Sequence, residues 1–311
     1  MALCAAIMFG AGVSGCSSSK PIRIGYIGGL TGGAASLGLE GREGVTLAID
    51  AINEAGGIDG RRIELVVRND SQDVETAKKA VRELVEEGCV AIIGPMTSSL
   101  AEPVAAVAAE EGIAIISPTV STDEMTGKAD AFFRVYPGNS SAAQELALLV
   151  KKMPGVTTVS VLYDASNSAH TVTWMEHFST AFEAASAGEV LAKVPFTTGS
   201  TVDFKAFASE IALGNPKALL ILANARDTGL ACQRLRAEGY DGVIVTSEWS
   251  STEDVIAHGG RSVEGVLFLS TFDRGSTVQP YLDAAARCES RYGHKLGFAG
   301  VHGYECVQIL A

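Results

Sequence analysis

The sequence predicts an α/β protein with two lobes, each built on a parallel β-sheet that helices cover on both faces. Short strands rich in β-branched residues alternate with amphipathic helices, which is typical of buried parallel sheets. This alternation is interrupted once near the middle of the chain and then starts again. The length of 311 residues and the hydrophobic content of 47% suit about two domains with large cores.

The first module begins with alternating apolar residues over 22–27, which predict a strand. Val45, Ala48, Ile49 and Ile52 then recur at helical spacing, and Gly56-Gly57 is expected to end this helix in the left-handed conformation. Beyond it, the same patterns predict further elements of the module: strands over 63–67, 90–93 and 113–116, and helices over 74–85 and 100–111.

The run Phe132–Gly138 breaks the rhythm, and a second module of the same kind follows. Its predicted strands cover 156–163, 190–196, 218–223, 243–246 and 265–269. Its predicted helices cover 141–152, 171–185, 204–213, 227–238 and 278–292. Residues 301–311 have a helical pattern without a stop signal, so we expect a chain truncated at this end.

The N-terminal residues resemble a bacterial lipoprotein signal. An apolar run over 3–13 has the length of a signal-peptide core and is too short to span a bilayer. Gly15-Cys16 ends it, and the serine run 17–19 follows. We therefore predict a signal peptide over 1–16, lipidation of Cys16 and a tether over 17–21. The alternative is an ordinary secretory signal with an incidental cysteine.

Charge and motif content exclude several classes of function. The chain has 24 basic and 36 acidic residues, and the resulting net charge of −12 argues against nucleic acid as a partner. The glycine-rich segment 28–33 lacks the lysine of a phosphate loop, and no G-x-S-x-G or H-E-x-x-H occurs. We therefore expect neither an enzyme nor a cofactor.

The cysteines and histidines do not predict a metal site. His170 and His177 are expected on the surface of one helix, without a third ligand. The four cysteines beyond the signal form no C-x-x-C pair, so buried free thiols are expected and a disulfide stays open: Cys89, Cys232, Cys288 and Cys306.

Hydroxyl residues gather where two neighbouring strands of the first module end. Thr97-Ser98-Ser99 follow one strand, and Thr119, Ser121 and Thr122 follow the next. Ligands of open parallel sheets bind at these carboxyl ends, and hydroxyls with free amides at a helix N-terminus suit a small carboxylate. Ser99 and Glu102 have the spacing of a capping box, so simple helix capping is the alternative.

The second module adds polar residues at its own strand ends. Glu248 follows the strand 243–246, where its carboxylate suits a substrate ammonium, although a solvated loop acid is the alternative. Asn224 and the segment 167–170 follow two other strands.

Several motifs resemble the branched-chain amino acid (Leu/Ile/Val) binding proteins of ABC transporters. They occur in family order: the run 53–61, Asn69-Asp70, Ile93-Gly94-Pro95, Ile116-Ser117-Pro118 and Phe133-Arg134-Val135. The resemblance implies the type I periplasmic-binding-protein fold, with two Rossmann-like lobes joined by three crossovers. Two crossovers match 136–139 and 270–273, and the third would lie beyond Ala311. The N-terminal lobe would then comprise 22–136 and 272–311, and the C-terminal lobe 137–271.

The resemblance also implies the roles of individual residues. Ser98 and Ser121 would hold an amino acid carboxylate, while the Thr119 carbonyl and Glu248 would hold its ammonium. Aromatic residues of the family are replaced at Leu37, near 168–170 (taken as His170) and at Asn224, so the polar contacts are kept while the side-chain walls differ.

The expected function is the extracytoplasmic, lipid-anchored solute-binding component of an ABC importer, with permease subunits as partners. The lobes would close on an aliphatic amino acid. The alternatives are an aromatic carboxylate, an amide or a polar amino acid as ligand, or a ligand-sensing domain.

Overall fold

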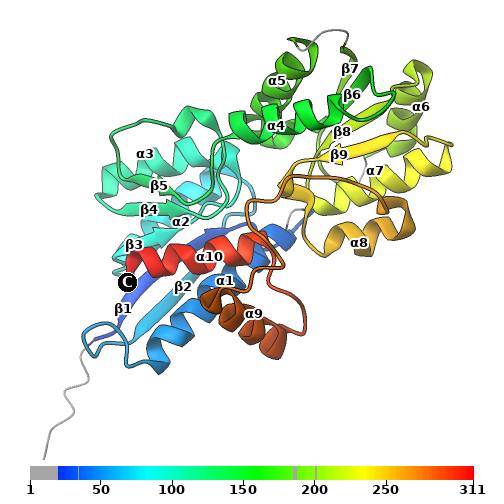
Figure 1. Cartoon of the computed structure of the whole chain (residues 1–311). Coiled ribbons are helices and arrows are strands. Elements are labelled where there is room, and N and C mark those ends of the chain that lie inside the picture. Colours follow the sequence, from blue (N-terminus) through cyan, green and yellow to red (C-terminus); the bar gives the residue numbers. More distant parts are fainter. Residues whose placement is uncertain (1–19, 34, 185–187, 200–201) are drawn as a thin grey trace, which may run out of the picture.

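The computed structural model describes residues 20–33, 35–184, 188–199 and 202–311. The predicted signal peptide, Cys16 and most of the tether lie outside these residues. Two α/β units stand beside each other, and their sheets are separate (Figure 1). Among the described helices, none combines the length and apolar character that a membrane crossing requires.

The first unit contains a five-stranded parallel sheet in the order β2-β1-β3-β4-β5. Its strands are β1 (Ile22–Gly28), β2 (Ile63–Asn69), β3 (Ala91–Ile93), β4 (Ala114–Ser117) and β5 (Phe132–Arg134). Parallel pairing sets the register, so that Ile93 of β3 lies beside Ile116 of β4. The residues that follow β3 and β4 therefore leave the sheet side by side.

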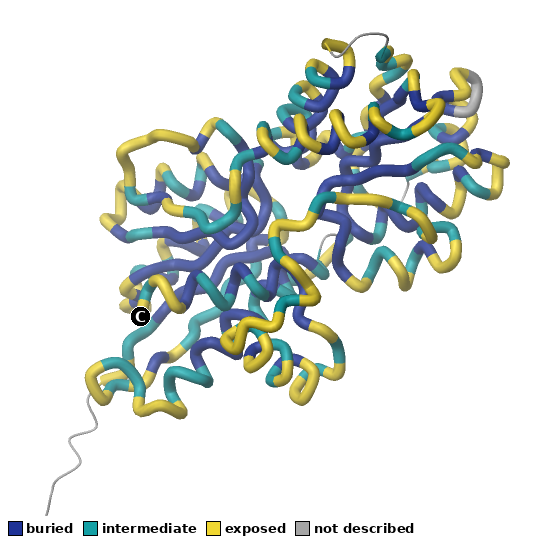
Figure 2. The backbone as a smooth tube through the Cα atoms, viewed as in Figure 1, coloured by how far each residue is buried: buried dark blue, intermediate teal, exposed yellow. Residues whose placement is uncertain are grey.

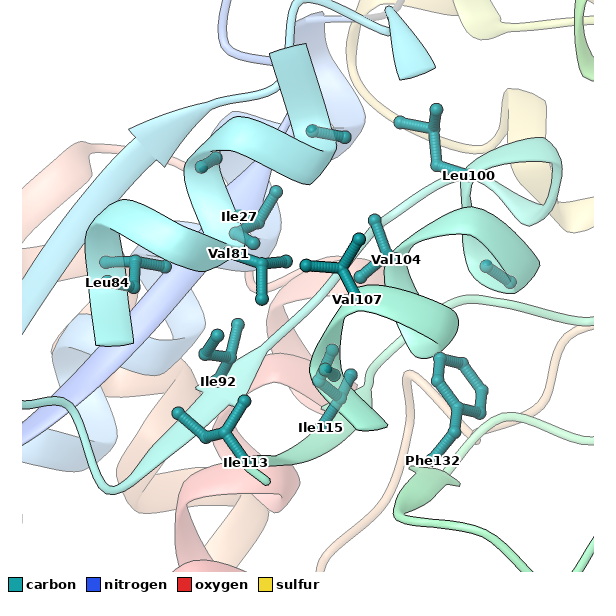
Figure 3. Packing of buried hydrophobic residues seen from close by; sticks show 14 of the residues in the cluster. Ile27, Val81, Leu84, Ile92, Leu100, Val104, Val107, Ile113, Ile115 and Phe132 are labelled. Atoms are coloured by element: carbon teal, nitrogen blue, oxygen red, sulfur yellow. The ribbon is translucent and has the colours of Figure 1, made fainter. Parts of the chain in front are cut away.

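Helices cover both faces of this sheet. α2 (Val74–Glu86) and α3 (Ala101–Glu111) pack on one face, where Val81 and Val107 meet Ile92 and Ile115 (Figure 3). α1 (Ala35–Glu54) and α10 (Phe298–Leu310) pack on the other face, and α9 (Gln279–Tyr292) lies against α1. The last two helices of the chain thus join the core of the first unit.

The second unit contains a four-stranded parallel sheet in the order β7-β6-β8-β9. Its strands are β6 (Thr158–Asp164), β7 (Glu189–Phe196), β8 (Ala218–Leu222) and β9 (Val243–Thr246). α4 (Asn139–Lys151) and α5 (Ser168–Ala184) cover one face, and α6 (Phe204–Gly214) and α7 (Ala225–Ala237) cover the other. α8 (Asp254–Gly259) packs beside α7. Strands β1, β3, β4, β6, β8 and β9 are buried along most of their length, whereas β2, β5 and β7, which lie at sheet edges, are more exposed (Figure 2).

Two predicted features of the strands were wrong. The break at 132–138 contains β5, a short edge strand whose three residues pair with β4. The predicted strand 265–269 is only an isolated bridge between Leu267 and Val245, with two backbone hydrogen bonds. In the described part of the chain this segment pairs with β9 at one residue, and Leu267 is 43% exposed.

The cysteine prediction was confirmed for the described residues, because Cys89, Cys232, Cys288 and Cys306 are buried and form no disulfide. Two short helices that follow strands are important for the site described below. They are η1 (Ser98–Leu100) after β3 and η4 (Glu248–Ser250) after β9.

Candidate functional site

A small cavity lies where the carboxyl ends of the two sheets face each other. Five of the seven predicted ligand-binding residues line it: Leu37, Ser98, Thr119, Ser121 and His170. The other lining residues are Met96, Tyr136, Asn167, Trp249 and Phe298. None of these ten side chains carries a permanent positive charge, so a bound anion would be held by hydrogen-bond donors.

Hydrogen bonds fix the two hydroxyl-rich loops of the first unit to each other. The Ser117 hydroxyl, at the end of β4, donates to the Pro95 carbonyl at 2.7 Å and accepts from the Val120 amide at 3.1 Å. The Thr119 hydroxyl donates to the Met96 carbonyl at 2.6 Å. The Thr119 side chain is therefore used within the protein, and its backbone carbonyl is the group left for a ligand.

The hydroxyl groups of Ser98 and Ser121 both line the cavity. The Ser121 amide donates to Ser98 Oγ at 3.1 Å, so this oxygen acts as an acceptor from the protein. Ser121 Oγ lies 2.9 Å from Nδ1 of His170. Both side chains are almost fully buried. Two adjacent O–H groups on a wall without cations form a suitable site for a carboxylate or another double acceptor.

His170 is buried, so the prediction of a surface histidine was wrong. It lies in the first turn of α5, which points toward the first unit, and it packs edge-on against Trp249 with 5.6 Å between the ring centroids. Burial lowers the pKa of the imidazole to about 4, so the ring is neutral at pH 7. His177 lies farther along α5, is partly exposed and bonds to Asp123 at 2.8 Å.

Glu248 lies behind the cavity wall. Tyr136, which lines the cavity, donates its phenolic hydroxyl to Glu248 Oε2 at 3.0 Å. The carboxylate also accepts from the Ser270 hydroxyl at 2.9 Å and from the Thr271 hydroxyl at 2.8 Å. The Thr271 amide lies 3.1 Å from both carboxylate oxygens. Glu248 thus binds the predicted crossover segment 270–273, and it is only 3% exposed.

Asn224 does not line the cavity. Its side chain caps α7 by accepting from the Asp227 amide at 2.9 Å, and its Nδ2 donates to the Asp227 carboxylate at 2.9 Å. A Cβ on Gly33 would lie 4.0 Å from Asn224 Nδ2, so the residue faces the glycine-rich loop of the first unit.

Contacts between the two units include a pair of exchanged helix caps. The Asn167 side chain accepts from the Ser99 amide at 3.0 Å, and the Ser99 hydroxyl accepts from the Ala169 amide of α5 at 3.3 Å. The alternative of a capping box formed by Ser99 and Glu102 was therefore wrong. Ser99 lies inside η1 and caps the helix that faces it from the second unit.

Sequence reasoning missed four of the ten residues that line the cavity. Tyr136 lies in a predicted crossover and Trp249 is adjacent to Glu248, so their positions contained a usable signal. Met96 and Phe298 did not, because each has the pattern of an ordinary core residue. In the described part of the chain, no cluster of three metal-ligating side chains occurs.

Two separate α/β units with a cavity lined by both at their facing strand ends have the architecture of a two-lobed solute-binding protein. The chain belongs to the periplasmic binding protein family, whose model matches residues 21–311. This family is extracytoplasmic, binds small ligands and works with ABC transporter permeases.

Curated relatives have names that specify the ligand class. A Leu/Ile/Val-binding protein homolog of Brucella melitensis is 25% identical over 275 residues, covering 87% of this chain and 73% of the relative. The Leu/Ile/Val-binding protein of Escherichia coli K12 is 24% identical over 301 residues, covering 91% of this chain and 76% of the relative.

Solved structures share the fold. A branched-chain amino acid transporter substrate-binding protein from Streptococcus pneumoniae, in complex with isoleucine, has a TM-score of 0.85 at 23% identity, with 93% of this chain and 82% of that chain covered. A solute-binding protein from Rhodopseudomonas palustris, in complex with benzoate, has a TM-score of 0.82 at 20% identity, with 93% and 79% covered.

Proposed function

We propose that this chain binds a small aliphatic amino acid, most closely a branched-chain one, in the cavity and delivers it to the permease subunits of an ABC importer. The pair of inward-facing hydroxyls on Ser98 and Ser121, beside an apolar wall, is the observation that carries the proposal. We further propose two lobes, 22–136 with 272–311 and 137–271, which close on the ligand.

The carboxylate of the amino acid would accept from both hydroxyls. Hydrogen bonds to a charged acceptor are stronger than neutral ones, and each is worth about 1.5–3 kcal/mol. Because no cation lines the cavity, these donors and the nearby backbone amides would provide the whole stabilisation of the anionic group.

The ammonium would lie between the Thr119 carbonyl and Glu248. In the described part of the chain, no Lys or Arg forms a salt bridge with Glu248, so its charge is balanced by hydrogen-bond donors alone. A buried carboxylate without a cationic partner favours an incoming ammonium. Because the Tyr136 hydroxyl lies between Glu248 and the cavity, the ammonium would take the place of this hydroxyl on Glu248 Oε2.

The aliphatic side chain would contact Leu37, Met96, Trp249 and Phe298, all of which are nearly fully buried. Each CH₂ group transferred from water to this wall contributes about 0.8 kcal/mol, so leucine should bind more tightly than alanine by about 2 kcal/mol.

Isothermal titration calorimetry with leucine, isoleucine, valine and alanine tests the proposal. Glu248→Gln should weaken leucine binding tenfold or more while changing the binding of 4-methylpentanoate, which lacks the ammonium, by less than threefold. Glu145→Gln is the matched control, because Glu145 borders the neighbouring cavity but is exposed. Equal leucine affinities of the wild type and Glu248→Gln would remove the ammonium role.

An aromatic carboxylate is the second candidate, because the hydrogen bonds to Glu248 are already complete without a ligand. Benzoate belongs in the same titration series. Tighter binding of benzoate than of every amino acid would favour this candidate and reject the first.

We also propose that the mature protein begins at Cys16 and is anchored by lipid on the outer face of the cytoplasmic membrane. The pattern Gly15-Cys16 followed by serines supports this. Metabolic labelling with a palmitate analogue should label the wild type and leave Cys16→Ser unlabelled. Equal labelling of both proteins would exclude the anchor.

A further inference from the structure

His170 contacts both units through its two ring nitrogens. Nδ1 lies 2.9 Å from Ser121 Oγ, which follows β4 of the first unit, and 3.1 Å from Asn139 Oδ1, at the start of α4. Nε2 lies 3.2 Å from Ser247 Oγ, which follows β9. The neutral ring carries one proton, and its position determines what Ser121 can do.

The neighbours of Asn139 place that proton on Nδ1. The Thr173 hydroxyl donates to the Ala169 carbonyl at 2.8 Å, so at its 2.6 Å contact with Asn139 it accepts from Nδ2. Asn139 Nδ2 also donates to the His170 carbonyl at 3.2 Å. The amide orientation is thereby fixed, and Oδ1, which can only accept, faces the His170 ring.

The remaining contacts agree with this tautomer. Because Asn139 Oδ1 requires a donor, Nδ1 is protonated. Nε2 is then the acceptor of a hydrogen bond from the Ser247 hydroxyl. Nδ1–H is then shared between Asn139 Oδ1 and Ser121 Oγ. Ser121 Oγ acts as an acceptor toward the protein, and its own proton is available to the cavity.

We propose that His170 is a positioning residue that holds the Ser121 hydroxyl as a donor toward the ligand, so that the site selects a carboxylate over the corresponding amide. The Ser121 backbone amide donates to Ser98 Oγ in the same way, so the Ser98 hydroxyl is also left as a donor toward the ligand. The two hydroxyl protons then each require an acceptor at one end of the ligand. A carboxylate offers an oxygen to each, whereas an amide places an NH₂ group against one of them. This inference rests on the proposed carboxylate site.

Two substitutions separate hydrogen bonding from packing. In His170→Asn the side-chain amide occupies the position of Nδ1, so a donor to Ser121 is kept. In His170→Gln the amide lies nearer the position of Nε2, and that donor is lost. Both variants lose the aromatic contact with Trp249 equally. Circular dichroism and thermal melting check that both fold, and His258→Gln, on α8 away from the cavity, is the control.

The readout is the ratio of the dissociation constants of leucinamide and leucine. We expect a ratio of at least 30 for the wild type and the control. His170→Asn should stay within threefold of this ratio, whereas His170→Gln should lose at least tenfold of leucine affinity and little of leucinamide affinity. Equal losses in the Asn and Gln variants would reduce His170 to a packing residue and overturn the proposal.

A measurement without ligand keeps this inference separate from the proposed function. Nitrogen-15 NMR of the imidazole at pH 7 should show His170 as the Nδ1–H tautomer in the ligand-free protein. An Nε2–H tautomer or a charged ring would overturn the positioning role. Failure of leucine to bind the wild type would instead reject the amino acid ligand, and the spectrum would still decide how His170 orients Ser121.

Discussion

The exchanged caps of Ser99 and Asn167 should help to hold the cleft closed. Each side chain satisfies an amide at the start of a helix in the opposite unit, at 3.0 Å for Asn167 and 3.3 Å for Ser99. Helix termini leave their first amides without partners inside the helix, so closure satisfies groups that opening returns to water. The caps therefore favour the closed arrangement.

The size of this contribution follows from capping energies. Replacing a good cap by alanine costs about 1 kcal/mol, and the longer Ser99 contact is the weaker of the two. Together they should favour closure by about 1–2 kcal/mol. If the ligand binds only the closed arrangement, the loss of both raises the dissociation constant about five- to thirtyfold.

Ser99→Ala is the cleaner perturbation, because Ser99 caps across the interface but does not line the cavity. Asn167 does line it, so Asn167→Ala is compared with Asn167→Asp, which keeps the accepting oxygen. Calorimetry with leucine gives the affinities, and small-angle scattering gives the dimensions with and without ligand. Wild-type affinity in both Ser99→Ala and Asn167→Ala would refute the reasoning.

Further expectations concern stability and pH. Leu84→Ala in the fully buried core of the first unit should cost about 2–5 kcal/mol in urea unfolding, whereas exposed Leu148→Ala should cost under about 0.5 kcal/mol; similar losses would contradict the packing. Gly44→Ala would place a Cβ 1.9 Å from the Gly300 carbonyl oxygen where α1 and α10 cross, so a fall in Tm of several degrees is expected, and an unchanged Tm would exclude this close approach. Burial raises the pKa of Glu40 from its ordinary 4.5 to about 7, so the folded state binds more protons between these values and loses stability as pH rises from 4.5 to 7. The free energy of unfolding is measured at pH 5 and pH 8, and in Glu40→Gln its decrease between these pH values should be smaller than in the wild type by about 1–3 kcal/mol. An equal decrease in both proteins would assign the pH dependence to other groups.

The sequence was sufficient for the layered α/β architecture because buried parallel strands and amphipathic helices have distinct periodicities. Prediction from the sequence failed where the pairing of a strand depends on the tertiary structure. The segment 265–269 has strand-like residues but only one bridging partner, and 132–134 became a strand because β4 offers an open edge.

The site was predicted in part for a similar reason. The ends of parallel strands converge at one edge, so Ser98, Thr119 and Ser121 could be assigned to one cavity. The burial of His170 depends on how the second unit faces the first, which periodicity within one helix does not encode. Phe298 reaches the cavity from α10, more than a hundred residues after Ser121 in the sequence, and its neighbours in the sequence give no signal of this role.

A crystal structure of the protein grown with leucine tests the central claim most directly. The account predicts one carboxylate oxygen within about 2.6–3.0 Å of Ser98 Oγ and the other at that distance from Ser121 Oγ, with the ammonium directed toward the Thr119 carbonyl and Glu248. A leucine bound elsewhere, or one in this cavity whose carboxylate points away from both hydroxyls, would contradict it.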